Sequence, residues 1–122
     1  MTRIALIGVF GAVGALTRLG VSNAIDVRTF PWATVLINVT GSFALGVLVA
    51  WGATRLSGDV ASALGIGFLG AYTTYSTFAV DVTLLGDDGR IRVAAAYLAA
   101  TTVLGIAAAV AGVALGRTLV DA

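Results

Sequence analysis

The chain has 122 residues, of which 59% are hydrophobic and only 11% are charged. An average soluble domain carries roughly 25% charged residues, so this composition indicates an integral membrane protein. The chain contains neither cysteine nor histidine, which excludes disulfide, thiolate and imidazole chemistry. Its net charge of +1 comes from arginines and aspartates alone, and no basic cluster is large enough to indicate binding to nucleic acid.

Four apolar segments follow one another along the chain, and each is long enough for a membrane helix of about 20 residues. They cover approximately residues 4–24, 32–53, 61–84 and 91–116. The stretches between them contain charge or Gly, Pro and Ser. We therefore expect an all-α integral membrane protein with a single four-span domain over residues 1–122. The first segment lacks a small-residue cleavage site, so we interpret it as a retained span rather than a signal peptide.

The arginines outside the spans are balanced between the two sides of the membrane. Four spans place Arg3, Arg55 and Arg117 on one side and Arg28, Arg90 and Arg92 on the other. A bias in these loop charges normally sets the orientation of a membrane protein. We therefore expect a dual-topology protein that inserts both ways and forms an antiparallel dimer. The alternative is a fixed orientation set by weak cues.

Two strongly polar side chains fall within the first two spans, where such groups usually mark function or a specific helix contact. Arg18 either extends its guanidinium to the membrane surface or holds positive potential at the mouth of an anion path. Asn38 offers two N–H donors and one carbonyl acceptor. It can therefore either hydrogen-bond a neighbouring helix or line a hydrated path.

The third span contains the stretch GAYTTYSTFAVD at residues 70–81, with hydroxyls on Thr73, Thr74, Ser76 and Thr77. Lipid offers no hydrogen-bond partner to hydroxyls or to backbone groups freed from a helix. Glycine and β-branched threonine are poor helix formers, so we expect the third helix to be broken near its middle. The exposed carbonyls would suit a hard cation such as sodium. The alternative is a continuous helix whose threonines donate back to their own carbonyls.

Polar groups are also present near the end of the third span and in the fourth. We expect Asp81 to be an interfacial or helix-contact residue rather than a proton carrier, because no second acid lies at membrane depth. Tyr97 and Thr101 are four residues apart and therefore share one face of a helix. This face could continue a polar track.

Four motifs span nearly the whole chain, and the third is the most specific of them. They are GAVGALTR at 11–18, NVTGSFALG at 38–46, GFLGAYTTYSTF at 67–78 and GRIRVAAAYLAATTVLG at 89–105. In this order they resemble the Fluc (CrcB) family of fluoride channels. The resemblance implies a multi-pass protein of the cell (plasma) membrane that exports cytoplasmic fluoride passively and supports fluoride resistance. It further implies two pores in an antiparallel dimer, with a structural sodium ion at the dimer interface.

The resemblance also implies roles for individual residues. The sodium ligands are the backbone carbonyls of Gly70 and Thr73, and Arg18 supplies charge at the pore mouth. The anion pathway is lined by Asn38, Tyr75, Ser76, Thr77, Phe78, Tyr97 and Thr101. Fluoride holds its water strongly, so a pore must replace that water with N–H and O–H donors. Aromatic ring edges carry the positive part of the ring quadrupole and can also favour an anion.

Two residues depart from the family pattern. Ala71 stands where a second glycine is usual; it adds only a methyl group, although it could strain a break that needs positive φ. Tyr75 stands where the first pore phenylalanine is usual. Because Tyr75 adds a hydroxyl, one alternative is a non-conducting subunit that pairs with a paralogous chain in a heterodimer. Another is a dual-topology exporter of the small multidrug resistance type. That family relies on an acidic residue in the first span, and this chain has none there.

Overall fold

The computed structural model describes residues 2–122, and these residues form only helices and short connections. Met1, the first residue of the predicted domain, lies outside the described residues. In chain order the elements are α1 (Thr2–Ala24), α2 (Trp32–Val47), the π-helix η1 (Leu48–Gly52), α3 (Ala53–Arg55), α4 (Gly58–Ser62), the π-helix η2 (Ala63–Leu69), α5 (Gly70–Tyr72), α6 (Tyr75–Asp87) and α7 (Ile91–Asp121). The prediction of an all-α protein is confirmed.

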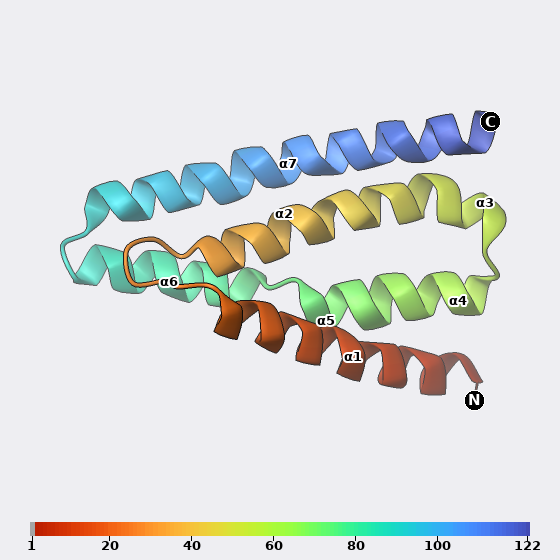
Figure 1. Ribbon diagram of the computed structural model, residues 1–122, viewed down its shortest axis with the longest axis horizontal. Coiled ribbons are helices and arrows are strands. Elements are labelled where there is room, and N and C mark those ends of the chain that lie inside the picture. The colour runs from red at the N-terminus through yellow and green to blue at the C-terminus, as the bar shows by residue number, and fades with distance from the viewer. Residues whose placement is uncertain (1) are drawn as a thin grey trace.

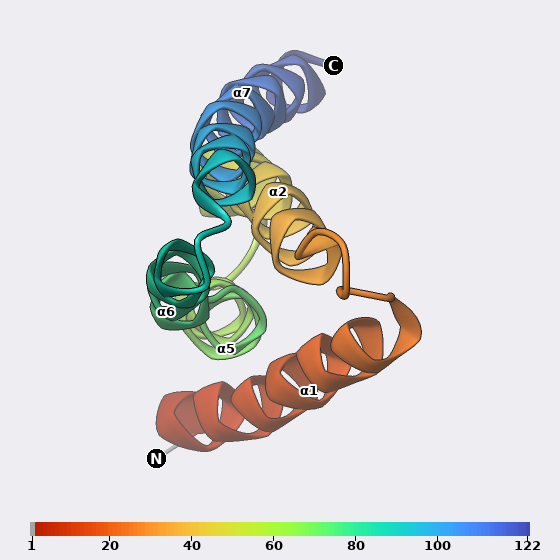
Figure 2. The ribbon, with the colours of Figure 1, turned by 90° about the vertical axis from the view of Figure 1, so that its left-hand side faces the viewer.

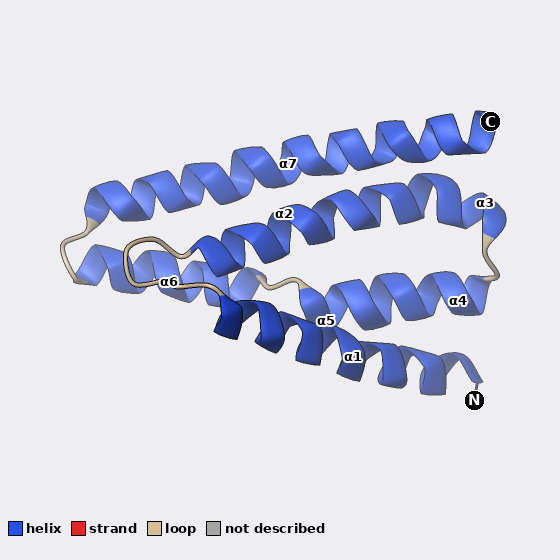
Figure 3. Ribbon diagram, in the orientation of Figure 1, coloured by secondary structure: helices blue, strands red, loops and turns tan. Residues whose placement is uncertain are grey.

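The elements join into four rods that run along the long axis of the molecule (Figure 1). Three rods are long and apolar enough to cross a membrane, namely Thr2–Ala24, Trp32–Arg55 and Ile91–Asp121. The remaining rod is interrupted between α5 and α6, where Figure 3 shows a loop in place of the helix, as the sequence predicted. Both ends of the described chain lie at the same end of the bundle (Figure 1). These helices and the composition show that the chain is a membrane protein.

The last helix extends beyond the apolar segment expected from the sequence. α7 has 31 residues and is therefore about 46 Å long at 1.5 Å per residue. The hydrocarbon core of a bilayer is about 30 Å thick, so α7 is long enough to continue past it as helix. Hydrophobicity marks the part of a helix that lies in lipid, and it does not mark where the helix ends.

Glycines allow the rods to approach each other at the level of the backbone. α2 and α7 pack side by side, with α1 crossing obliquely on the other side of the α5–α6 rod (Figure 2). A Cβ atom at Gly112 of α7 would overlap the carbonyl oxygen of Phe43 in α2. A Cβ at Gly14 of α1 would likewise overlap the carbonyl of Phe68. No hydrophobic effect acts between helices in lipid, so close van der Waals packing of this kind stabilises their association instead.

The ion pairs of residues 2–122 lie at the ends of the bundle and are exposed. Arg3 Nε lies 2.7 Å from Asp59 Oδ1, and Arg28 Nη2 lies 2.9 Å from Asp26 Oδ2. The side-chain hydrogen bonds of Arg28, followed by its backbone N–H, lower the pKa of Asp26 from its ordinary value. Exposed pairs of this kind contribute little to stability. The packing of the rods, and not these charges, therefore holds the bundle together.

Candidate ion pathway at the helix break

The break between α5 and α6 consists of two threonines in extended conformation. Thr73 has φ −79° and ψ 160°, and Thr74 has φ −152° and ψ 111°. β-branched residues adopt such angles readily. Among residues 2–122 no residue other than glycine has a positive φ. The condition under which Ala71 could strain the break is therefore not met, because this break is made by extended residues and not by a left-handed one.

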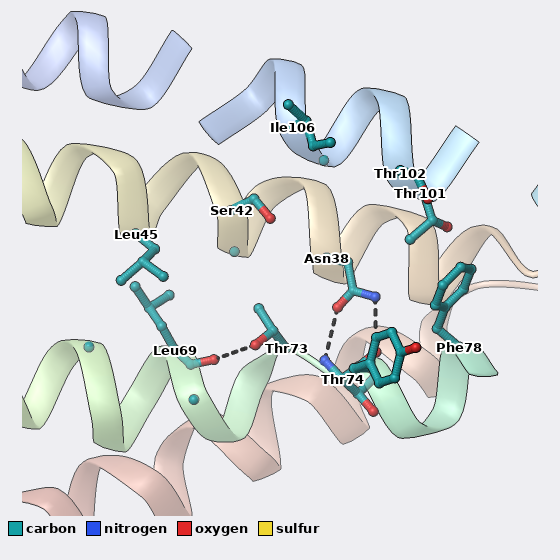
Figure 4. Close-up of a pocket in the computed structure, with 15 residues that line it drawn as sticks. Asn38, Ser42, Leu45, Leu69, Thr73, Thr74, Phe78, Thr101, Thr102 and Ile106 are labelled. Carbon is teal, nitrogen blue, oxygen red and sulfur yellow. Dashed lines mark hydrogen bonds between the residues drawn. The ribbon is translucent and has the colours of Figure 1, made fainter. Parts of the chain in front are cut away.

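Asn38 holds the break through two hydrogen bonds to the backbone of Thr74. The Asn38 Nδ2 donates to the Thr74 carbonyl at 3.0 Å, and the Thr74 N–H donates to Asn38 Oδ1 at 2.9 Å (Figure 4). The amide thereby supplies an acceptor to the Thr74 N–H, which has no helical partner at the break, and a further donor to the Thr74 carbonyl. One N–H of Nδ2 remains for another acceptor. The geometry therefore supports the helix-contact interpretation of Asn38 and still leaves a donor beside the cavity described below.

The neighbours of Thr74 also contact the same part of α2. The Thr40 hydroxyl donates to the Leu36 carbonyl at 2.7 Å. The Tyr72 hydroxyl, 2.9 Å from Thr40 Oγ1, is therefore the donor in that pair. A Cβ at Gly41 would overlap the Cγ2 atom of Thr73, so the glycine lets the break lie against α2. One short segment of α2 thus contacts three consecutive residues around the break.

The break frees four backbone carbonyls from their helical partners, because α5 ends at Tyr72 and α6 begins at Tyr75. In an α-helix each N–H donates to the carbonyl four residues earlier. The Thr74 N–H would donate to Gly70 in a continuous helix, but it donates to Asn38. The Thr77 N–H would donate to Thr73, but it donates to Thr74 Oγ1 at 3.2 Å. The carbonyls of residues 70–73 are therefore all without their helical donors, and Gly70 and Thr73, which the family resemblance implied as sodium ligands, are two of these four.

Thr74 is the N-cap of α6, and its replacement gives a first testable prediction. Thr74→Ala removes the oxygen that accepts the Thr77 N–H, so we expect the free energy of unfolding to fall by about 1 kcal/mol. Thr74→Ser keeps this oxygen and should stay within a few tenths of a kcal/mol. Thermal unfolding of both variants in detergent measures the difference. Equal losses in the two variants would show that the hydroxyl does not act as a cap.

A cavity of about 410 Å³ lies beside the break, between α2, the α5–α6 rod and α7. Six of the ten residues predicted for the site line it, namely Asn38, Gly70, Thr73, Tyr75, Phe78 and Thr101. Ser42 and Thr102 also line this cavity, although the sequence analysis did not assign them. Ser42 could have been found from its spacing, because it lies four residues after Asn38 on the same helical face. No acidic residue is present in the cavity lining.

Tyr97 lies next to this cavity in the aromatic core. It is completely buried, and its hydroxyl donates to Asp81 Oδ2 at 3.0 Å. This hydrogen bond agrees with the expectation that Asp81 makes a helix contact. The Tyr97 ring meets Phe78 edge to face, with 5.1 Å between the ring centroids and 76° between the planes. Tyr75 meets Phe78 in a similar way at 6.1 Å and 64°. The rings thus present edges as well as faces around Phe78.

Besides Tyr97, three predicted residues lie outside the cavity of about 410 Å³. Thr77 lines a second cavity of about 340 Å³, together with Thr34 and Asp81. Ser76 is exposed on α6. Arg18 is half-buried on α1 and lines neither of these cavities. The structure therefore does not bring these three residues together with the others in a single cavity of this chain.

Polar groups around the cavity of about 410 Å³ need hydrogen-bond partners that residues 2–122 do not supply. The buried hydroxyl of Thr101 has no hydrogen-bond partner among these residues. Leaving such a group unpaired costs about 1–3 kcal/mol. Tyr75 is 80% exposed, and Gly70 beside the break is also exposed. At membrane depth a phenol hydroxyl and a free carbonyl need protein, water or an ion against them, because lipid cannot hydrogen-bond to them.

Comparisons with known proteins identify the family. The family described as CrcB-like protein, Camphor Resistance (CrcB) matches residues 5–113. The Fluoride-specific ion channel FluC of Rhodospirillum centenum is 41% identical, over 98% of this chain and 99% of its own length. The protein of the same name from Agrobacterium fabrum is 40% identical over the same shares.

A third relative covers slightly less of the chain. The Fluoride-specific ion channel FluC 1 of Symbiobacterium thermophilum is 44% identical, over 91% of this chain and 94% of its own length. All three relatives are named as ion channels and not as enzymes. The motifs, the match along most of the chain and the near-complete coverage of these relatives agree, so the chain belongs to the CrcB family of membrane channels and is not an enzyme.

Proposed function

We propose that this protein is a fluoride-selective, passive channel that exports fluoride from the cytoplasm across the cell membrane. The observation that carries the proposal is the cavity at the helix break, where an amide N–H, a buried unpaired hydroxyl and aromatic rings lie together. Its lining contains donors and no carboxylate, which suits a small anion. The fluoride-specific names of the relatives support this choice of ion.

The functional unit in this proposal is an antiparallel dimer. The exposed ring of Tyr75 and the exposed backbone of Gly70 would be covered by a second copy. The balanced arginines support insertion in both orientations. Arg18, Ser76, Thr77 and Tyr97 would continue the anion path beyond the cavity of the single chain. In this arrangement the third-span breaks of the two copies face each other.

A structural sodium ion at the dimer interface is the second part of the proposal. The carbonyls of Gly70 and Thr73 would hold it, and both lack their helical donors. Carbonyl oxygens suit a hard cation. The ion would supply a fixed positive charge near the anion path, where the low dielectric makes its effect larger than in water.

Fluoride efflux from liposomes tests the function directly. The purified chain alone is reconstituted, and external fluoride and chloride are followed with selective electrodes. We expect fast fluoride release and chloride release no faster than from empty liposomes. Equal release of the two ions would contradict the proposal. If the chain is silent alone but conducts with a paralogous chain, it is instead the partner subunit of a heterodimer. Family membership disfavours the drug-exporter alternative.

Sodium removal provides a separate prediction about the cation. Replacing sodium with N-methylglucamine in the buffer should lower the midpoint of thermal unfolding of the detergent-solubilised protein and shift it toward monomer. The reason is that a ligand bound only to the folded dimer stabilises it by mass action. Size-exclusion chromatography with light scattering measures the assembly. Identical midpoints and masses in the two buffers would argue against a structural sodium ion.

A further inference from the structure

Ser42 carries a hydroxyl that the proposed function does not use. Helical threonines elsewhere donate their hydroxyls to the carbonyl four residues earlier, as in the pairs Thr17 with Val13, Thr40 with Leu36 and Thr83 with Ala79. Ser42 is half-buried in α2 and forms no hydrogen bond within residues 2–122. Figure 4 shows its hydroxyl pointing away from α2 toward the cavity. One O–H donor is therefore free in the cavity.

The residue opposite Ser42 leaves space beside this hydroxyl. Gly105 of α7 lines the same cavity, and a Cβ atom placed there would lie 3.9 Å from Ser42 Oγ. Because Gly105 has no side chain, α7 neither fills this space nor offers the hydroxyl a side-chain partner. The distance of 3.9 Å is an ordinary contact, so the glycine is not required for the packing of the two helices at this level.

The position of Ser42 relates it to the residues already placed in the cavity. Ser42 follows Asn38 by one helical turn on α2, and Gly105 follows Thr101 by one turn on α7. Four residues of helix rise about 6 Å. The cavity therefore has two successive levels, with the Asn38 amide and the Thr101 hydroxyl at the first. The Ser42 hydroxyl and the vacant side of Gly105 form the second.

We propose that Ser42 and Gly105 form a further anion subsite, about 6 Å along the path from Asn38, that takes a small halide such as fluoride. This inference rests on the proposed channel function and extends the path toward the end of the bundle where α3 lies. The hydroxyl donates to the ion, and the missing side chain of Gly105 provides the room. No acidic residue lines the cavity to oppose an anion at this level.

Four variants in the liposome fluoride assay test the subsite. Ser42→Ala removes the donor and should slow fluoride release about 10-fold or more, since a hydrogen bond to a charged group is lost. Ser42→Thr keeps the hydroxyl and should stay within about 3-fold of the wild type. Gly105→Ala fills the space without changing the hydroxyl and should also slow release. Ser62→Ala is the matched control, because Ser62 is half-buried on α4 and lies outside the cavity.

The outcomes separate this inference from the proposed function. If the wild type conducts fluoride and Ser42→Ala releases it at the same rate, the subsite is overturned and the proposed channel function stands. Absence of flux from the wild type, alone and with a paralogous chain, would overturn both. The midpoint of thermal unfolding and the oligomeric mass are measured for every variant and should not change. If Ser42→Ala instead converts a dimer to monomer, Ser42 donates to a second copy and the subsite is wrong. Gly105→Ala tests the subsite with the Ser42 hydroxyl retained.

Discussion

Asn38→Asp should reduce fluoride flux by on the order of 100-fold or more. The aspartate keeps the oxygen that accepts the Thr74 N–H, but its second oxygen would face the Thr74 carbonyl oxygen at the position where Asn38 Nδ2 now donates at 3.0 Å. The change removes one hydrogen bond at the break and also the remaining N–H beside the cavity. It further places a negative charge where an anion must pass, and like charges repel strongly at low dielectric.

The liposome assay measures this effect, with Asn23→Asp as the matched control. Asn23 is exposed at the end of α1 and lines neither cavity, so the same chemical change there should alter flux by less than about 2-fold. The midpoint of thermal unfolding should fall for Asn38→Asp, because the Thr74 carbonyl loses the Asn38 donor and instead faces a carboxylate oxygen. A variant that conducts at half the wild-type rate or faster would contradict the placement of Asn38 on the path.

Gly112→Ala should destabilise the bundle by about 1–3 kcal/mol or more, because the new methyl group would overlap the Phe43 carbonyl. The overlap involves the backbone of α2, which cannot rotate away as a side chain can. α2 and α7 must therefore separate, which also disturbs the cavity between them. Without this contact a change from glycine to alanine favours a helix interior by about 1 kcal/mol. Gly112→Ala is thus expected to lower the free energy of unfolding, whereas helix propensity alone would raise it.

Gly8→Ala is the control for this prediction. Gly8 lies in α1, and a Cβ atom there would have no neighbour within 4 Å. We expect its midpoint of thermal unfolding to equal that of the wild type or to exceed it slightly. Thermal unfolding and size-exclusion chromatography of both variants provide the measurement. Equal midpoints for Gly112→Ala and Gly8→Ala would show that the α2–α7 contact is looser than the structure indicates.

The sequence by itself determined the class of the protein, its family and the position of the helix break. Composition alone excluded a soluble domain, because so few charged residues cannot cover a water-exposed surface. Gly70 and the β-branched threonines after it predicted a break near the middle of the third span, since propensity is a local property of the chain. Four motifs in order, of which the one at 67–78 is the most specific, named the family, which the comparisons then confirmed.

Only the tertiary structure decided which groups meet. The hydrogen bonds between Asn38 and Thr74 join residues 36 positions apart, so they depend on how α2 packs against the broken rod. Sequence could not distinguish the tightly packed Gly112 from Gly8, because both are glycines at helical spacing and their difference lies in the neighbouring helix. Ser42 lies by its spacing on the same helical face as Asn38, but spacing does not show the space beside the Ser42 hydroxyl. Its free hydroxyl becomes visible only when Gly105 is found opposite it, and contacts between helices are not encoded in the periodicity of either helix alone.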